Sequence, residues 1–176
     1  DCLNGQADYD PVISIFIFDA SGNLVLVQNV VAPSNTPQLI PNDLGPCVAT
    51  TPQICVEEGV YTTTVSLPPI PGGYTVAWAR CCRNSAISNL SNPLGQGITF
   101  LARIPGTEIP DCNSMPQFNQ VPPIFLCVNE QFTFDHSATD LDGDSLVYAL
   151  TDPYTGLNFQ SFGAGNPQQG GNPPTV

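Results

Sequence analysis

The chain has 176 residues, 41% of them hydrophobic, which is enough to build globular cores in one large or two small domains. Fifteen acidic residues stand against three basic ones, lysine is absent, and the formal net charge of -12 argues against binding to nucleic acid or insertion into an anionic membrane. Nineteen prolines and fifteen glycines separate short runs rich in β-branched and aromatic residues, and no capped segment has a helical period. We therefore predict an all-β protein.

Five strands are predicted before residue 105. The segment Pro11–Gln28 contains two alternating apolar runs joined by a turn at Ala20–Asn23, which is typical of a β-hairpin. The segments Val60–Leu67, Tyr74–Cys82 and Gly97–Ile104 also alternate between apolar and polar residues, and each is predicted to form a strand.

Two segments mark the organisation of the chain. Ala32–Thr51 is rich in Pro, Asn and Thr and predicts an irregular surface loop, which is also a candidate binding loop. Pro105–Pro110 carries turn residues without alternation, so we place a domain boundary there. The predicted modules are residues 1–106 and 107–176, both β-sandwiches with Pro-rich loops.

The most informative stretch is Asn129–Leu150, where an acidic loop lies between alternating runs. Asp140, Asp142 and Asp144 project from a turn that Gly143 makes possible, and carboxylates crowded in this way repel one another unless a cation binds among them. The loop is not an EF-hand, because glycine and the bidentate glutamate do not stand at the sixth and twelfth positions. Two interpretations stay open, a calcium site and a solvated turn whose side chains bond their own backbone.

Seven cysteines predict a disulfide framework in an oxidising compartment. They are Cys2, Cys47, Cys55, Cys81, Cys82, Cys112 and Cys127. No C-x-x-C pair is present, which disfavours structural zinc. We expect Cys47 to pair with Cys55, and adjacent Cys81 and Cys82 to seek different partners, one of them Cys2, because neighbouring strand residues point to opposite faces. The odd number leaves one thiol for a partner outside the chain. The protein is therefore predicted to be extracellular.

No pattern in the chain predicts catalysis. His136 stands between Asp135 and Ser137, but neighbours on a strand point apart and no G-x-S-x-G elbow accompanies them. Adjacent Glu57 and Glu58 likewise face oppositely and do not form a glycosidase-like pair. We predict that the protein is not an enzyme.

A family resemblance rests on four segments. These are DC at Asp1–Cys2, the run CVEEGVYTTTVSLPPIPGGY at Cys55–Tyr74, RCCRN at Arg80–Asn84, and Cys112–Leu150. They resemble the extracellular repeat units of very large Bacteroidota surface proteins, a family that includes gliding-motility adhesins exported by type IX secretion. The resemblance implies immunoglobulin-like or PKD-like modules. This chain departs from that pattern in three places: the strand that usually precedes the first cysteine is missing, the sorting domain is missing, and Thr151 stands where a cysteine is often found. These departures suggest an internal segment with an incomplete second module.

The second module also resembles cadherin-like domains. Their linker carries Asp and Asn ahead of a Pro-x-Phe, matched here at Pro116 and Phe118. The resemblance implies a calcium site with the ligands Asp111, Asn113, Glu130, Asp140, Asp142 and Asp144. Calcium takes six to eight oxygens, so ligands from linker and domain together would stiffen a rod of modules.

A third short match concerns glycosylation. Asp144, Ser145 and Leu146 resemble the Asp-Ser/Thr-apolar acceptor that Bacteroidota use for O-glycosylation, which would place a glycan on Ser145. This role conflicts with a metal role for Asp144.

These observations predict two tandem immunoglobulin-like and PKD/cadherin-like β-sandwich modules, forming a structural or adhesive part of a secreted cell-surface protein. The expected partners are neighbouring copies or modules of the same protein and surface glycans. One alternative is a self-assembling extracellular filament subunit completed by a neighbour's strand. Another is a carbohydrate-binding module whose site is shaped by Ala32–Thr51.

Overall fold

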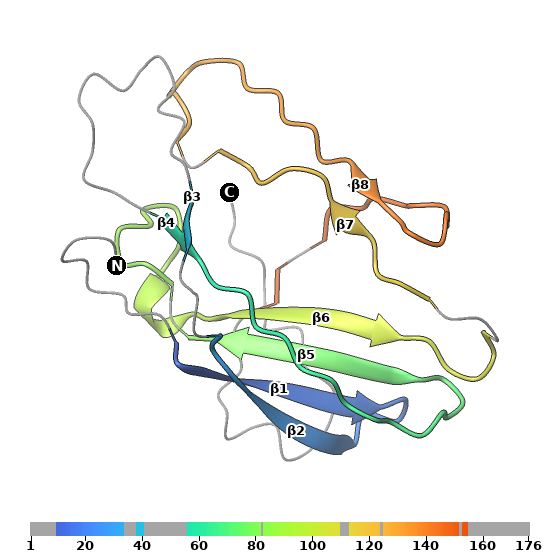
Figure 1. Cartoon of the computed structure of the whole chain (residues 1–176). Helices are drawn as coiled ribbons and strands as arrows, with labels where there is room; N and C mark the ends of the chain where they lie inside the picture. The colour runs from blue at the N-terminus through green and yellow to red at the C-terminus, as the bar shows by residue number, and fades with distance from the viewer. Residues whose placement is uncertain are drawn as a thin grey trace. The chain divides into compact units, whose positions relative to one another are not determined.

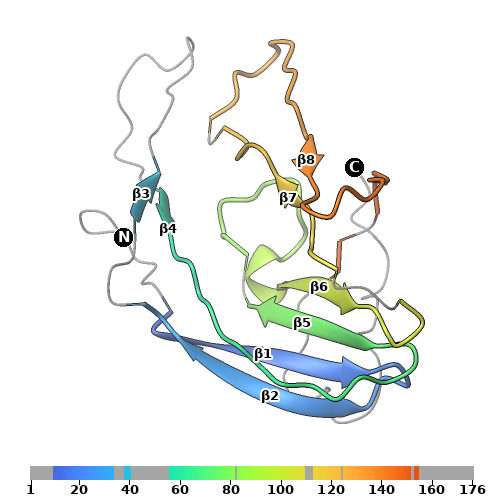
Figure 2. The same ribbon diagram turned by 45° about the vertical axis from the view of Figure 1, so that its right-hand side comes forward.

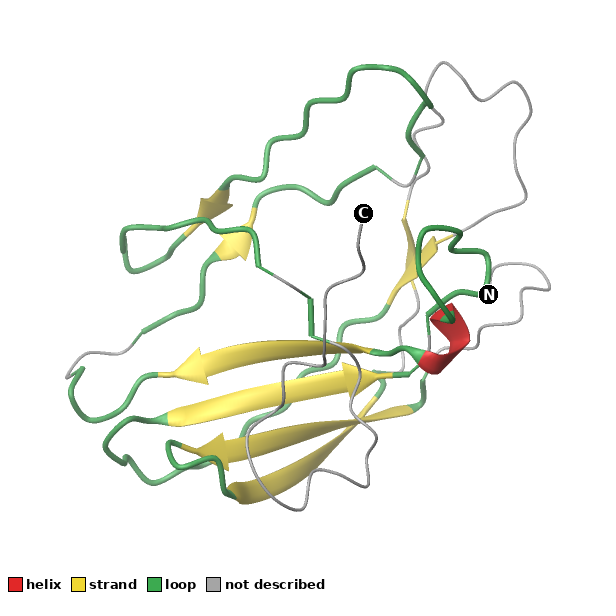
Figure 3. Ribbon diagram, turned by 180° about the vertical axis from the view of Figure 1, so that it is seen from behind, coloured by secondary structure: helices red, strands yellow, loops and turns green. Residues whose placement is uncertain are grey.

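The computed structural model of the chain is all-β, as predicted. It describes residues 10–33, 38–40, 56–81, 83–109, 113–123, 125–151 and 153–154. Within these ranges the regular structure consists of β-strands and one short 3-10 turn, η1 at Pro93–Gly95 (Figure 3). The strands form one four-stranded and two two-stranded sheets.

The chain divides into two compact units, each built from segments that are distant in the sequence. One unit takes in Asp1–Val12, Val31–Thr62 and Cys112–Tyr148, and the other takes in Ile13–Val30, Thr63–Asp111 and Ala149–Val176. We call them the small-sheet unit and the large-sheet unit. The predicted modules 1–106 and 107–176 stay a prediction.

The large-sheet unit contains the four-stranded sheet, in the order β2-β1-β5-β6 (Figures 1 and 2). Its strands are β1 (Val12–Asp19), β2 (Leu24–Val31), β5 (Tyr74–Arg80) and β6 (Ile98–Ile104). The antiparallel partners β1 and β5 are central, and β6 pairs antiparallel with β5. The predicted hairpin and the two later strands are confirmed, although β2 continues to Val31 and β5 ends at Arg80.

The core of this sheet forms where the two central strands meet. Phe16 lies opposite Ala77, and Ala77 lies opposite Leu101 on β6. Ala77 is 0% exposed and Phe18 1% exposed, and the partly buried Phe16 and Leu101 pack against them. Successive strand residues face opposite sides of a sheet, so these side chains share one face because their registers match.

On the other face of β5 an aromatic pair spans two strands. Trp78 pairs with Phe100 across the β5–β6 ladder, and their rings stack with centroids 5.5 Å apart at an interplanar angle of 15°. Such pairs contribute about 0.5–1.5 kcal/mol beyond the area they bury.

The β1–β2 turn is organised by one carboxylate. The Asp19 side chain accepts hydrogen bonds from the backbone N–H of Ser21 (2.9 Å) and Asn23 (2.8 Å) and from the Asn23 side-chain amide (2.9 Å). Gly22 adopts φ +82°, which a glycine reaches without a steric cost. The hydrogen bonds from the Asn23 side chain, and then from backbone N–H groups, hold the pKa of Asp19 below its ordinary value.

A close backbone contact joins the turn before β5 to the turn after β6. Gly73 has φ +64°, and a Cβ on it would lie 2.0 Å from the carbonyl oxygen of Ile104. A Cβ on Gly106 would lie 2.5 Å from the backbone nitrogen of Gly72. The Gly72 N–H donates to the Glu108 carboxylate at 3.1 Å, and bonds from the backbone N–H groups of Glu108 and Gly72 lower the pKa of that carboxyl. We call this contact the glycine clasp.

The connection between β5 and β6 is held by Arg83. Its backbone N–H lies 3.2 Å from the carbonyl oxygen of Pro93 and 2.8 Å from that of Gln96, and its guanidinium Nε donates to the Gly97 carbonyl at 3.2 Å. Arginine is always protonated, so this bond is charge-assisted and independent of ordinary pH.

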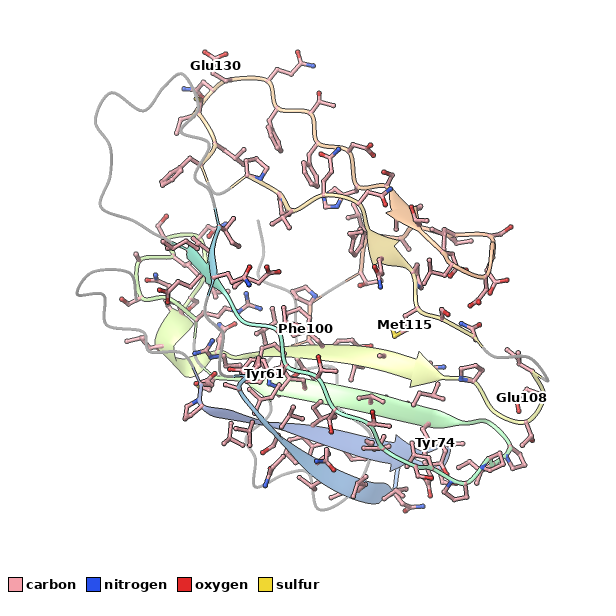
Figure 4. All side chains as sticks on the ribbon, viewed as in Figure 1. Tyr61, Tyr74, Phe100, Glu108, Met115 and Glu130 are labelled. Atoms are coloured by element: carbon pink, nitrogen blue, oxygen red, sulfur yellow. The ribbon has the colours of Figure 1, made fainter. Side chains whose placement is uncertain are left out.

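The predicted strand at Val60–Leu67 is wrong. The segment is extended, but it has no ladder partner assigned among the described residues. Tyrosine hydroxyls anchor its surroundings instead, since Tyr61 donates to the Asp10 carbonyl and Tyr74 donates to the Pro68 carbonyl (Figure 4). The prolines that follow Leu67 lack the N–H groups that a ladder needs.

The small-sheet unit has two short antiparallel pairs, β3 (Gln38–Ile40) with β4 (Val56–Glu58) and β7 (Gln117–Phe118) with β8 (Ala138–Thr139). None of its described residues is fully buried. The alternating runs predicted on either side of the acidic loop are extended without being strands.

We predict that Gly73→Ala lowers the free energy of unfolding by about 3 kcal/mol or more, because a left-handed backbone and a clash with backbone atoms both oppose the added methyl group. Gly143→Ala is the matched control, since Gly143 has φ +80° and nothing lies within 4 Å of its added Cβ. It should cost only about 1–2 kcal/mol. Thermal and urea unfolding measure both, and equal losses would contradict the steric clasp.

We also predict a pH-dependent role for Asp19. Its folded pKa is depressed, so its stabilising contribution is full above about pH 4, the usual aspartate pKa, and is lost as pH falls through the lower folded value. The difference in melting temperature between the parent and Asp19→Asn should therefore shrink from pH 6 toward about pH 2–3. A difference that stays constant over this range would refute the proposed ionisation.

Candidate functional site

The acidic loop after β8 is a turn in which carboxylates accept backbone hydrogen bonds. The Asp140 carboxylate accepts the N–H of Asp142 at 2.9 Å and the N–H of Asp144 at 3.2 Å. Gly143 lies within this turn in the left-handed region, at φ +80°. Aspartates in turns commonly bond their own backbone in this way. The geometry is that of the second interpretation considered above, a turn that satisfies itself.

A second carboxylate ties this turn to the segment before β7. The Asp142 side chain accepts hydrogen bonds from the Ser114 backbone N–H and, at 3.4 Å, from the Ser114 hydroxyl. Ser114 also accepts a bond at its carbonyl from the Asn113 side-chain amide at 2.8 Å. Hydrogen bonds between a backbone N–H and an ionised acceptor are stronger than neutral ones, so the turn is fastened to a segment 28 residues earlier in the chain.

Among the described residues, the predicted calcium ligands are not gathered into one group. Figure 4 shows Glu130 at one tip of its loop, away from the turn after β8. Asp111 lies outside the described residues. Within the described part of the chain, no three acidic, cysteine or histidine side chains stand close enough together to hold a metal ion. Calcium binding by Asp140, Asp142 and Asp144 stays a prediction.

The cysteine framework is described at two positions. Cys81, directly after β5, and Cys127, in the loop before Glu130, are both disulfide-bonded. The other predicted participants, Cys2, Cys47, Cys55, Cys82 and Cys112, lie outside the described residues. The expected pairings of these five therefore stay predictions.

The acceptor predicted for a glycan is accessible. Ser145 is exposed, and its neighbour Leu146 is half-buried. A hydroxyl that is to be glycosylated must be reachable by an enzyme, so its position meets this requirement. Glycosylation of Ser145 stays a prediction.

An aromatic row on the small-sheet unit was not predicted. Phe132 and Phe134 stack with ring centroids 6.3 Å apart, and Phe134 meets His136 edge-on at 4.6 Å. Phe118 on β7 adds a second edge-on contact to His136 at 6.1 Å. We call these four side chains the aromatic row. The spacing of two between residues 132, 134 and 136 was the available signal, because alternate residues of an extended chain share a side.

The row is accessible to a partner. Phe118 is 68% and Phe132 is 50% exposed, and His136 is also exposed. Asp135 does not contribute its carboxylate to the row, because it accepts bonds from the Ser137 backbone N–H at 2.9 Å and hydroxyl at 3.1 Å. Exposed apolar side chains that gather in one place mark interaction surfaces more often than single ones do.

Comparisons with known proteins identify no relative whose function could explain this surface. No protein-family model matches the chain, and no curated protein or solved structure matches it either. Among the described residues, no helix is long and apolar enough to cross a lipid bilayer.

We predict that Asp140→Ala destabilises the acidic turn even without metal. In the presence of a chelator, its free energy of unfolding should fall by about 0.5–1.5 kcal/mol, because two solvent-exposed backbone N–H groups exchange their carboxylate acceptor for water. Asp144→Ala is the control, since Asp144 contributes its backbone N–H to the turn and alanine retains it. Chemical denaturation measures both. Equal losses would contradict the role assigned to Asp140.

The same two variants test whether the acidic loop binds calcium. If the predicted site forms, about 1–10 mM calcium should raise the melting temperature of the parent, as expected for weak extracellular sites, and both variants should lose this rise. A melting temperature unaffected by calcium would rule out the metal and leave the hydrogen-bonded turn.

Proposed function

We propose that this chain is a structural and adhesive module of a secreted cell-surface protein, and that the aromatic row makes its adhesive contact. The observation that carries the proposal is the exposure of Phe118 and Phe132 within one connected set of rings. Aromatic side chains present large, rigid apolar faces whose positions cost little conformational entropy to fix.

The chemistry of the rest of the chain supports a place outside the cell. Disulfide bonds at Cys81 and Cys127 persist only where the medium is oxidising. The formal net charge of -12 makes separate copies repel one another and so favours solubility. The finer assignment, tandem immunoglobulin-like and PKD/cadherin-like sandwiches in a type IX-secreted adhesin, rests on the sequence resemblance and is part of the proposal.

Surface glycans are the ligand class that best suits the row. The apolar face of a sugar ring can pack on an aromatic face, and the polar edges of the sugar need nearby hydrogen-bonding groups. The exposed His136, whose imidazole is itself part of the row, provides such a group. The bonds of Asn119 to Ser137 at 3.0 Å and to Thr139 at 2.8 Å lie on the other side of the β7–β8 ladder. In this proposal, carbohydrate binding and adhesion are carried out by the same surface, the aromatic row.

We predict that Phe118→Ser and Phe132→Ser each reduce retention of the protein on a polysaccharide-coated surface by about tenfold or more, the loss expected for a central aromatic anchor. Val121→Ser is the matched control, because Val121 is as exposed as Phe118, at 68%, and lies outside the row. A quartz-crystal microbalance with a panel of immobilised polysaccharides measures retention.

Melting temperatures of the three variants should stay within a few degrees of the parent, because none of the replaced side chains is buried. Equal retention of the Phe118→Ser and Val121→Ser proteins would contradict the assignment of the aromatic row. A parent protein that none of the surfaces retains would contradict glycan adhesion itself.

A further inference from the structure

The four-stranded sheet has one outer strand whose own sequence lacks the residues that usually prevent pairing. β2 reads LVLVQNVV over Leu24–Val31 and contains no charged residue, proline or glycine. Leu24, Val25, Val27 and Val31 are 43%, 48%, 44% and 69% exposed. Natural edge strands are normally blunted by charges, prolines, bulges or a covering segment, and long uncharged apolar edges pair with other chains.

The opposite outer strand is different. On β6, the Thr99 N–H donates to the Tyr154 carbonyl at 3.3 Å, so an isolated bridge occupies part of that edge. β6 also carries the charged Arg103. Among the described strands, none pairs with the outer edge of β2. One edge of the sheet is therefore covered and charged, while the other is uncharged.

Charge determines where two copies of this chain can approach each other. Each copy carries a formal net charge of -12, so two copies repel wherever their carboxylates approach. The eight residues of β2 form a strip that contributes no carboxylate to such an encounter. Two β2 edges can also satisfy one another, because antiparallel strands related by a two-fold axis exchange their N–H and C=O groups reciprocally.

Charge also selects the direction of pairing. Asp19 lies at the turn that precedes β2. Parallel pairing would bring the two Asp19 turns side by side. Antiparallel pairing separates them by the length of an eight-residue strand, about 26 Å at 3.3 Å per residue. This exceeds the Debye length of about 8 Å at physiological ionic strength, so their repulsion is screened.

We propose that β2 pairs antiparallel with β2 of a second copy of this chain and forms a continuous eight-stranded sheet across a two-fold axis. The count follows from the four strands of each copy. Because the contact is isologous it uses the outer edge of β2 in both copies, so assembly stops at a dimer. This inference rests on β2 and does not depend on the proposed adhesive function.

Sedimentation velocity of the full chain over a range of concentrations tests the dimer. Free thiols should first be alkylated without reduction, so that the native disulfides stay intact and intermolecular disulfides cannot form. A reversible monomer–dimer equilibrium is expected, and added salt should strengthen it, because salt screens the repulsion between two acidic copies.

Val27→Glu should raise the dimer dissociation constant by about tenfold or more, since the two-fold axis brings the new carboxylates of both copies onto one strip. Val60→Glu is the control. It makes the same change of charge at a valine that is 56% exposed and lies outside β2, and its dissociation constant should stay within about twofold of the parent.

Hydrogen exchange of the unmodified sequence gives a second measurement that does not depend on any variant folding correctly. Protection of amides in Leu24–Val31 should rise with protein concentration, while protection in β6 should not. Four results would overturn the proposal. The first is a parent that stays monomeric at about 0.5 mM, because its dissociation constant would then be too high for specific pairing. The others are a dimer that survives Val27→Glu, assembly beyond the dimer, and concentration-dependent protection confined to other segments.

Discussion

The close packing around Ala77 is the constraint on which the four-stranded sheet depends. This residue lies in the middle of β5, opposite Phe16 on one side and Leu101 on the other, and its side chain is fully buried. A methyl group at this point leaves room for the phenylalanines of β1 to fill the face of the sheet. A larger residue would displace the neighbouring side chains Phe16, Phe18 and Leu101, because protein interiors are close-packed and tolerate added volume poorly. The hairpin turn and the glycine clasp then fix the ends of strands whose middle is set by this contact.

The two units stabilise themselves in different ways. The buried residues among those described all belong to the large-sheet unit, including Ile17, Phe18, Tyr74 and Ala77. In the small-sheet unit, order comes from side chains that bond the backbone: Asp140 within its own turn and Asp142 across to Ser114. A domain that buries little apolar surface needs covalent or polar cross-links to offset its conformational entropy. The disulfide at Cys127 is such a cross-link.

Alternation in the sequence predicted the strands that bury a face and failed where burial was absent. The hairpin, β5 and β6 were predicted correctly because their apolar residues pack against one another. A period of two in the sequence places such residues on one buried face of a strand. Val60–Leu67 has the same period but no ladder partner, since alternation reports an extended backbone and not the neighbour that would complete it. The acidic loop was located correctly, but a sequence cannot show that Asp142 reaches Ser114, 28 residues away. The aromatic row depends on a similar distant contact, that of Phe118 with His136.

The scarcity of basic residues has a consequence for proteolysis. Enzymes that cut after arginine or lysine have only three sites in this chain, at Arg80, Arg83 and Arg103. Arg80 is paired with Ile98 and Arg103 with Thr75 in the β5–β6 ladder, and Arg83 is held by the carbonyl groups of the connection between these strands. A protease must draw several residues into its cleft in an extended form, so each cut requires this part of the sheet to open first. Trypsin-like digestion of the native protein therefore reports the opening of β5 from β6, and the long loops elsewhere offer such enzymes nothing to cut.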